Sequence, residues 1–183
     1  EDGRGGQVAL VRLEGVALER LDRGQRPVHQ LGAGPALRQR LLERFINIYP
    51  PFIGAGIHSR IVDERSVDVE MKLTSFNRNL VGVHFGGSLY AMCDPWFMLI
   101  LMRLLGPDYI VWDKAASIQF KRPGRGKVKA RFHIPAEQVE QIRLDADREG
   151  KITPTFSVDV LDEDGQVVAH VGKLLYIRRK EER

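Results

Sequence analysis

Residues 86–106, GGSLYAMCDPWFMLILMRLLG, constrain the fold more than any other stretch, because as a helix they are apolar nearly all the way round. A helix without a polar face is buried in its protein. The stretch nevertheless carries one acid, Asp94, directly before Pro95. A carboxylate in apolar surroundings is unfavourable unless it is hydrogen-bonded or faces a cavity. We therefore interpret Asp94 as a functional candidate, with a structural acid held by a backbone amide or an arginine as the alternative. Pro95 removes a helix hydrogen bond and favours a kink beside it.

The composition indicates one soluble globular domain, because 183 residues with 43% apolar and 28% charged side chains are enough for a real core. The net charge of +4, with basic and acidic residues interleaved, does not require a nucleic-acid partner. The single cysteine, Cys93, excludes a disulfide within the chain and suits a reducing cytoplasm. No signal-peptide pattern is visible, and the longest apolar run, 96–102, is too short to span a bilayer. We expect a cytoplasmic protein without a membrane span.

Two parts of the chain differ in character. Residues 1–34 are rich in Gly and Arg, and we interpret them as an extension that is loosely structured or docks on the surface of a domain formed by 35–183. That domain opens with apolar residues at helical spacing, which predict a helix ended by Pro50 and Pro51. The apolar face of this helix is expected to comprise Leu37, Leu41, Leu42, Phe45 and Ile48.

Strand patterns lie on both sides of the apolar helix. Residues 56–74 alternate between apolar and charged side chains, which predicts a half-buried strand pair or one long bent strand. After the helix, strand patterns at 109–120 and 127–135 are joined by the turn sequence KRPGRG, and a short polar helix follows. The chain closes with two strands around the turn DEDG, residues 162–165. This order predicts an α+β fold, in which an antiparallel sheet wraps around one long buried helix.

The spacing of Asn79, Gly82, Phe85-Gly86-Gly87 and Asp94 is similar to the signature of hot-dog-fold acyl-CoA thioesterases, although many members have His-Gly-Gly there. The longer pattern FGGSLYAMCDPW…DYIVWDKAASIQFKRPGRG resembles most closely the tetrameric acyl-CoA thioesterase-like branch. The resemblance covers about residues 35–180. It implies the hot-dog fold, an acyl-CoA substrate, and a homodimer or a dimer of dimers with its sites between subunits. No Cys/His cluster suggests a metal, so we expect neither a metal nor a redox cofactor.

The resemblance assigns roles to the motif. The backbone N–H of Gly86 would be the oxyanion donor, and Gly87 would allow close packing, whereas the alternative is a tight turn into a helix. Asp94 of one subunit would face the glycines of the other and act as general base or nucleophile. Asn79 would hold the attacking water or the carboxylate, although an asparagine here is equally consistent with a purely turn-forming role. Asn77 is the weaker candidate.

A second acid, Asp113, stands on the following strand, where many family members carry Ser or Thr. Alternation places it on the face opposite Trp112 and Ile118, toward the partner subunit, where it would orient water. A salt bridge with Lys114 or an arginine is the structural alternative.

Substrate contacts are expected from Phe85, in the motif, and from a basic loop. Arg122, Arg125 and Lys127 in this loop suit the phosphates of coenzyme A, but a solvated hairpin end is equally consistent with them. We interpret His84 as structural and Cys93 as a small buried hydrophobe.

Two other functions are compatible with the same fold. One is a non-catalytic module that binds acyl-CoA or fatty acid. The other is a dehydratase, which would need a catalytic His paired with an acid at a spacing that this sequence lacks.

Overall fold

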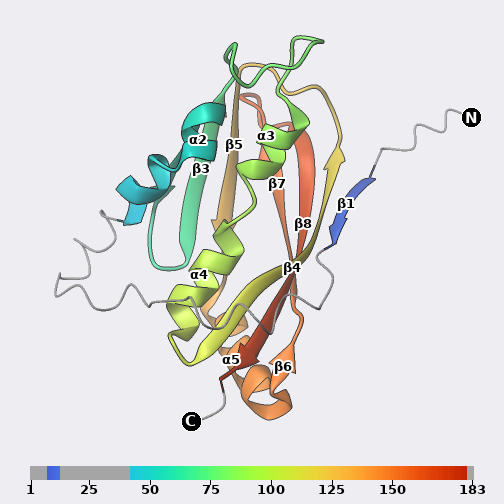
Figure 1. Cartoon of the computed structure of the whole chain (residues 1–183). Helices are drawn as coiled ribbons and strands as arrows, with labels where there is room; N and C mark the ends of the chain where they lie inside the picture. Colours follow the sequence, from blue (N-terminus) through green and yellow to red (C-terminus); the bar gives the residue numbers. More distant parts are fainter. Residues whose placement is uncertain (1–7, 13–41, 181–183) are drawn as a thin grey trace, which may run out of the picture.

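The computed structural model describes residues 8–12 and 42–180, which form one antiparallel sheet with helices packed against it (Figure 1). The strands follow the order β1-β4-β8-β7-β5-β3-β2, and β6 pairs with β8 off this path. They are β1 (Val8–Arg12), β2 (Ile57–Ile61), β3 (Ser66–Lys72), β4 (Tyr109–Phe120), β5 (Lys127–His133), β6 (Lys151–Ile152), β7 (Thr155–Leu161) and β8 (Val167–Arg179). The helices are α2 (Pro50–Ala55), α3 (Gly86–Ala91), α4 (Trp96–Leu105) and α5 (Ala136–Glu149).

The expected central helix is present but consists of two parts, α3 and α4, joined by a turn over residues 92–95. Pro95 is the N-cap of α4, so the break falls where its missing N–H cannot continue the helix. Both parts lie against the sheet (Figure 1). The predicted kink is confirmed, and Asp94 lies in the interruption rather than within a helical turn. The stretch Gly86–Leu105 is long and apolar enough to cross a membrane, yet α4 packs into the core of the domain.

Aromatic side chains pack α4 against the sheet. Phe97 stacks on Phe156 of β7 at a centroid distance of 4.9 Å and meets Phe132 of β5 edge-on at 5.2 Å. Trp96 and Phe97 are almost fully buried, which anchors the helix directly after the turn that carries Asp94. Because packed aromatic pairs stabilise a core beyond their buried area, this contact fixes the position of that turn.

The prediction for the first helix is partly wrong. Residues 42–47 are helical, and this helix ends before Pro50 and Pro51. The two prolines also form the first turn of a second helix, α2, because proline is tolerated at that position. Phe45 and Ile48 are 69% and 64% exposed, and Ile46 is buried instead. Leu37 and Leu41 lie outside the described residues.

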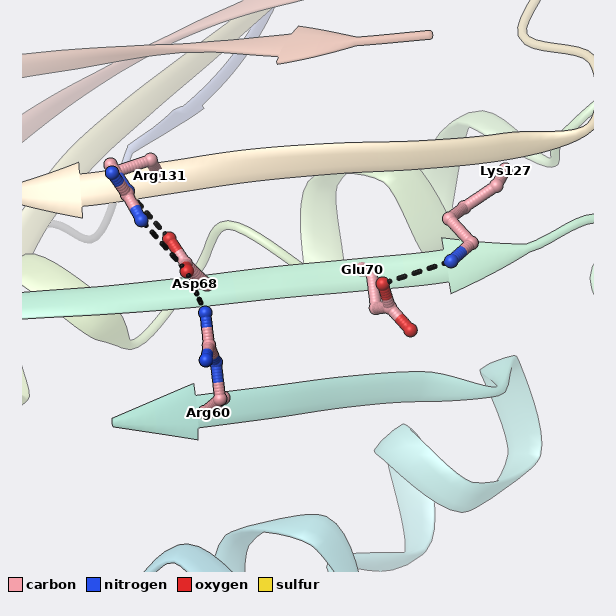
Figure 2. A network of polar contacts seen from close by, with 5 residues as sticks. All are labelled: Arg60, Asp68, Glu70, Lys127 and Arg131. Carbon is pink, nitrogen blue, oxygen red and sulfur yellow. Dashed lines mark hydrogen bonds and ion pairs between the residues drawn. The ribbon is translucent and has the colours of Figure 1, made fainter. Parts of the chain in front are cut away.

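The strand pair predicted at 56–74 is confirmed as the hairpin β2–β3, with Val67, Val69 and Met71 facing the core. The outer face of the hairpin is charged, and its side chains form ion pairs with side chains of neighbouring strands (Figure 2). Asp68 of β3 accepts hydrogen bonds from Arg131 of β5 at 2.6 and 2.9 Å and from Arg60 of β2 at 2.8 Å. These bonds, led by those from Arg131, hold the pKa of Asp68 below its ordinary value.

The strand β1 falls within the expected extension of residues 1–34. It pairs antiparallel with β4, from Val8 opposite Gln119 to Arg12 opposite Ala115. At least this part of the extension therefore docks on the sheet edge, while residues 13–41 lie outside the described structure.

Candidate active site

The loop before α3 is held in place by Asn77, whose side chain is 1% exposed. Its Oδ1 accepts a hydrogen bond from Thr74 N at 2.8 Å, while its Nδ2 donates to Ala55 O at 2.7 Å and Lys72 O at 2.8 Å. Its carbonyl oxygen accepts from Phe85 N at 2.7 Å. Asn77 thus ties the start of α3 to α2 and β3, which makes it a structural residue.

Asn79 lies in the same loop and bonds differently. Its Oδ1 accepts from Val81 N at 3.1 Å and from Val83 N at 3.2 Å, as a turn-forming asparagine does. Its Nδ2 donates to no described residue. The amide NH₂ therefore remains available to a water or a carboxylate, which is the role that the resemblance assigns to it.

The two glycines of the motif open α3, and their backbone N–H groups bond to no described residue, as is usual in a first helical turn. A Cβ on Gly86 would meet Phe120 Cζ at 2.8 Å, and one on Gly87 would run into the ring of Phe85. Aromatic rings therefore approach the backbone where only glycine leaves room. Phe85 is 56% exposed.

Asp94 lies in a network of polar side chains that belongs to three parts of the fold. Its Oδ1 accepts hydrogen bonds from Tyr90 Oη at 2.6 Å and from Lys173 Nζ at 2.9 Å. Lys173 Nζ also lies 3.0 Å from Asp113 Oδ1 and 3.3 Å from Tyr90 Oη. The Lys173 side chain is 0% exposed, whereas the Asp94 side chain is 48% exposed. One ammonium is thus shared by a partly exposed carboxylate and a more deeply placed one.

Burial and charge oppose each other in this network. Burial alone would lower the pKa of Lys173, but the negative charges of Asp113 and Asp94 outweigh it and raise that pKa above its ordinary value. Burial raises the pKa of Asp113, although Lys173 acts against the rise. Burial and the bond to Asp94 raise the pKa of Tyr90 to about 12. Lys173 is therefore charged and Tyr90 is a neutral donor at pH 7.

Neither Lys173 nor Tyr90 was among the catalytic residues predicted from the sequence. One signal was present, because Lys173 is in phase with Val171 and Leu175, which both point into the core. A lysine at an inward position of an alternating strand needs partners, and two acids provide them here.

The predicted orientation of Asp113 is wrong in one respect. It lies opposite Leu175, which is fully buried, so it faces the core side. A register shift between Asp113 and Ala115 adds one residue to β4, and simple alternation fails beyond it. Asp113 therefore shares a face with Ile118, whose register partner Val171 is also buried. Because of this bulge, Asp113 pairs with Lys173 rather than with Lys114.

The basic loop does not converge on this network. Lys127 forms an ion pair with Glu70 at 3.2 Å (Figure 2), and Arg122 Nη1 donates to Gln166 Oε1 at 3.3 Å. Arg125 has no polar partner among the described residues. This leaves Arg125 as the loop residue most open to a phosphate.

His84 joins the basic loop to the loop before α3. Its Nε2 lies 3.0 Å from Gly126 O, its backbone N donates to Gly124 O, and its side chain is buried. Burial lowers its pKa, so the ring is neutral at pH 7, in agreement with a structural role. Cys93 is also fully buried, and burial raises the pKa of its thiol, which fits a small hydrophobe.

Comparisons with known proteins agree with this fold. A family model described as a domain of unknown function, DUF4442, matches residues 38–177, and no curated protein matches the chain. The chain is similar to the solved structure of a probable thioesterase from Pseudomonas aeruginosa, with 22% identity and a TM-score of 0.67, over 76% of this chain and 95% of that one. A protein of unknown function from Chlorobaculum tepidum shares 17% identity at a TM-score of 0.65, over 80% and 97%.

A third solved structure, a thioesterase from Haemophilus influenzae, shares 16% identity at a TM-score of 0.58, over 79% of this chain and 93% of that one. At such identities the likeness establishes the fold alone. That fold is the expected hot-dog architecture.

Proposed function

Since the chain belongs to the family described as domain of unknown function DUF4442 and has the hot-dog fold, we propose that it is an acyl-CoA thioesterase. It would hydrolyse an acyl-CoA to a free acid and coenzyme A. The observation that carries the proposal is the Asp94 carboxylate, which is held on one oxygen by Tyr90 and Lys173 while its side chain remains 48% exposed. The exposed side chain leaves Asp94 accessible to a water or a substrate, while the buried Lys173 holds it from the inner side.

The chemistry needs a base or nucleophile and a donor for the carbonyl oxygen. Asp94 would take a proton from a water that attacks the thioester carbon, and the coenzyme A thiolate would leave. Alternatively, Asp94 would attack the carbon itself, the thiolate would leave, and water would then hydrolyse the resulting mixed anhydride to the free acid. The negative charge on the carbonyl oxygen would be stabilised by the free N–H of Gly86. One such donor is worth roughly 3 kcal/mol of the barrier. The free Nδ2 of Asn79 is placed on the same loop and is suited to hold the water or the carboxylate.

Helix geometry argues that the two groups come from different chains. Asp94 follows Gly86 by eight positions, and the helical part of this stretch, α3, alone rises by roughly 7.5 Å at about 1.5 Å per residue before the turn over 92–95 begins. One reacting carbonyl is too small to reach both. A dimer in which the Asp94 of one subunit faces the Gly86 of the other removes this separation. Each symmetric dimer would hold two such sites.

The loop before α3 also favours a partner. Its apolar side chains Phe76, Leu80, Val81 and Phe85 are exposed, and clustered apolar exposure of this kind marks interaction sites. We propose a homodimer or a dimer of dimers in the cytoplasm. Light scattering at micromolar concentration should give at least twice the protomer mass. An active protein at the protomer mass would contradict a shared site.

Thiol release from a panel of acyl-CoAs tests the activity directly, with Asp94→Asn as the decisive variant. Asparagine keeps the size of the side chain but cannot take a proton or attack, so kcat should fall at least about 100-fold while acyl-CoA still binds. Asp113→Asn should lower kcat less, because Asp113 lies behind Lys173. Full turnover by Asp94→Asn, or a larger loss at Asp113, would overturn the assignment. Tight binding of acyl-CoA with no thiol release by the parent would instead identify a binding module.

Mixing variants tests the shared site. Gly86→Pro lacks the proposed oxyanion donor, and Asp94→Asn lacks the base, so each homodimer should be inactive. A mixed dimer contains one site in which both groups are intact. Partial recovery of activity on mixing is therefore expected, and a mixture as inactive as its components would contradict the two-chain model.

A further inference from the structure

The buried ammonium of Lys173 lies at the centre of the candidate site without touching solvent. We propose that Lys173 is a positioning residue: together with Tyr90 it clamps one oxygen of Asp94 and leaves the other oxygen aimed outward as the reacting atom. This inference rests on the proposed thioesterase function and extends it to a residue outside the motif.

The geometry of the clamp is specific to one oxygen. Tyr90 Oη at 2.6 Å and Lys173 Nζ at 2.9 Å both donate to Asp94 Oδ1. Oδ2 bonds to none of the described side chains or backbone groups. Because charge-assisted bonds are the strong ones, two of them on one oxygen define the direction of the carboxylate plane. The same two bonds also hold Asp94 in position within the turn at 92–95, where no regular helix supports it.

Lys173 is itself held in place. Its side chain is 0% exposed, its Nζ lies 5.4 Å from the ring centroid of Tyr90, and Asp113 Oδ1 lies at 3.0 Å on the other side. Asp113 therefore anchors the lysine, and the lysine orients Asp94. The role of anchoring Lys173 explains why Asp113 is present at a position where its side chain is only 21% exposed.

Among the described residues, the titratable groups whose charge acts on Lys173, or is acted on by it, belong to this arrangement. Tyr90 comes from α3, Cys93 and Asp94 from the following turn, and Asp113 from β4. From β7 the register partner of Lys173 is the apolar Phe156. Two carboxylates and one ammonium give the cluster a charge of −1 when all three are ionised. Removal of Lys173 would leave two carboxylates facing each other, which favours protonation of one of them.

The test uses Lys173→Met, alone and combined with Asp113→Asn, with Lys129→Met as the control. Lys129 is exposed on the outer face of β5, so its replacement removes the same charge away from the site. Methionine matches the length of lysine, and the double variant removes one charge of each sign. The double variant should therefore fold like the parent even if the single variant is weakened.

We expect the folded double variant to lose roughly 100-fold in kcat, the scale of a misplacement of about 1 Å, with KM little changed. In Lys173→Met the acid limb of the pH–rate profile should move up by roughly one pH unit or more, because an opposite charge has gone. Lys129→Met should match the parent in both. A lysine without effect on Asp94 would leave both the pH profile and kcat of a normally folded variant unchanged.

Carboxyl NMR of Asp94 provides a reading that does not depend on turnover. With aspartate labelled at the carboxyl carbon, the Asp94 resonance at pH 7.5 should shift in the double variant, because one of the two hydrogen bonds to Oδ1 is lost. An unchanged resonance with kcat within about threefold of the parent would show that Lys173 only balances Asp113. A double variant that does not fold would likewise make Lys173 a structural residue. A parent protein that releases no thiol refutes the proposed function, and the resonance still decides whether the two bonds to Oδ1 exist.

Discussion

Two asparagines separated by one residue allow a sharp test of which one is structural. Asn77 donates from its Nδ2 to Ala55 O and Lys72 O. Asn79 accepts from Val81 N and Val83 N, and its Nδ2 donates to no described residue. Replacement by aspartate keeps an acceptor and removes the NH₂ donor. Asn77→Asp should therefore be strongly destabilising, and Asn79→Asp should leave stability nearly unchanged.

The magnitude follows from the hydrogen bonds. Asn77 makes three side-chain bonds from a position that is 1% exposed. Loss of its donors leaves the part-buried carbonyl oxygens of Ala55 and Lys72 without this partner, at about 1–3 kcal/mol each. We expect Asn77→Asp to lower the free energy of unfolding by about 3–5 kcal/mol at pH 7.5. For a domain of this size, about 1 kcal/mol corresponds to a Tm shift of roughly 2–4 °C.

The pH dependence has a definite sign. A carboxylate at position 77 would be buried against two carbonyl oxygens, so its folded-state pKa would lie above the unfolded value of about 3.9. A group with a raised folded pKa contributes its stability below the unfolded pKa and loses it as pH rises through the folded pKa. The defect of Asn77→Asp should therefore be smaller at pH 5 than at pH 7.5.

Urea unfolding of Asn77→Asp, Asn77→Ala and Asn79→Asp at the two pH values measures these differences without any assumption about activity. Equal stability of Asn77→Asp and the parent at pH 7.5, or a defect that grows toward pH 5, would refute the hydrogen-bond assignment. The same variants address chemistry. If the Nδ2 of Asn79 holds a water or a carboxylate, Asn79→Asp should lose thiol release while it remains as stable as the parent.

Two further predictions concern the basic loop and the extension. Replacing Arg122 and Arg125 with Ala should raise KM for acyl-CoA and leave kcat nearly unchanged, the mark of lost uniform binding, and an unaltered KM would assign the loop to solvent. Deleting residues 1–34 removes β1 from the edge of β4 but leaves the core residues of β4, β8 and the central helix in place. We expect folding and thiol release to remain largely intact, and a large fall in Tm would show that the extension belongs to the core.

The sequence was sufficient for the parts of the fold that depend on local pattern. The apolar stretch over 86–106 predicted a buried central helix, and the alternation of Val67, Val69 and Met71 predicted a strand with one face in the core. Pro95 predicted the break beside Asp94. Each of these follows from periodicity or from a missing N–H group, which are properties of the residues themselves.

The parts that were missed depend on which strands meet. Nothing near Asp94 in the sequence points to Lys173, because the two residues meet only where the turn before α4 lies against β8. The orientation of Asp113 failed for a related reason, since one added residue in β4 reverses the alternation beyond it.

The inward lysine was nevertheless visible as a conflict with its strand, between Val171 and Leu175. A strand that buries a lysine among apolar neighbours needs carboxylates on the elements that pack against it. Asp94 and Asp113 were the two acids already singled out around the central helix. The carboxylate in an apolar stretch and the lysine in an apolar strand therefore have a common physical explanation, because the fully buried ammonium needs the carboxylates, and Asp94 reaches it while staying partly exposed.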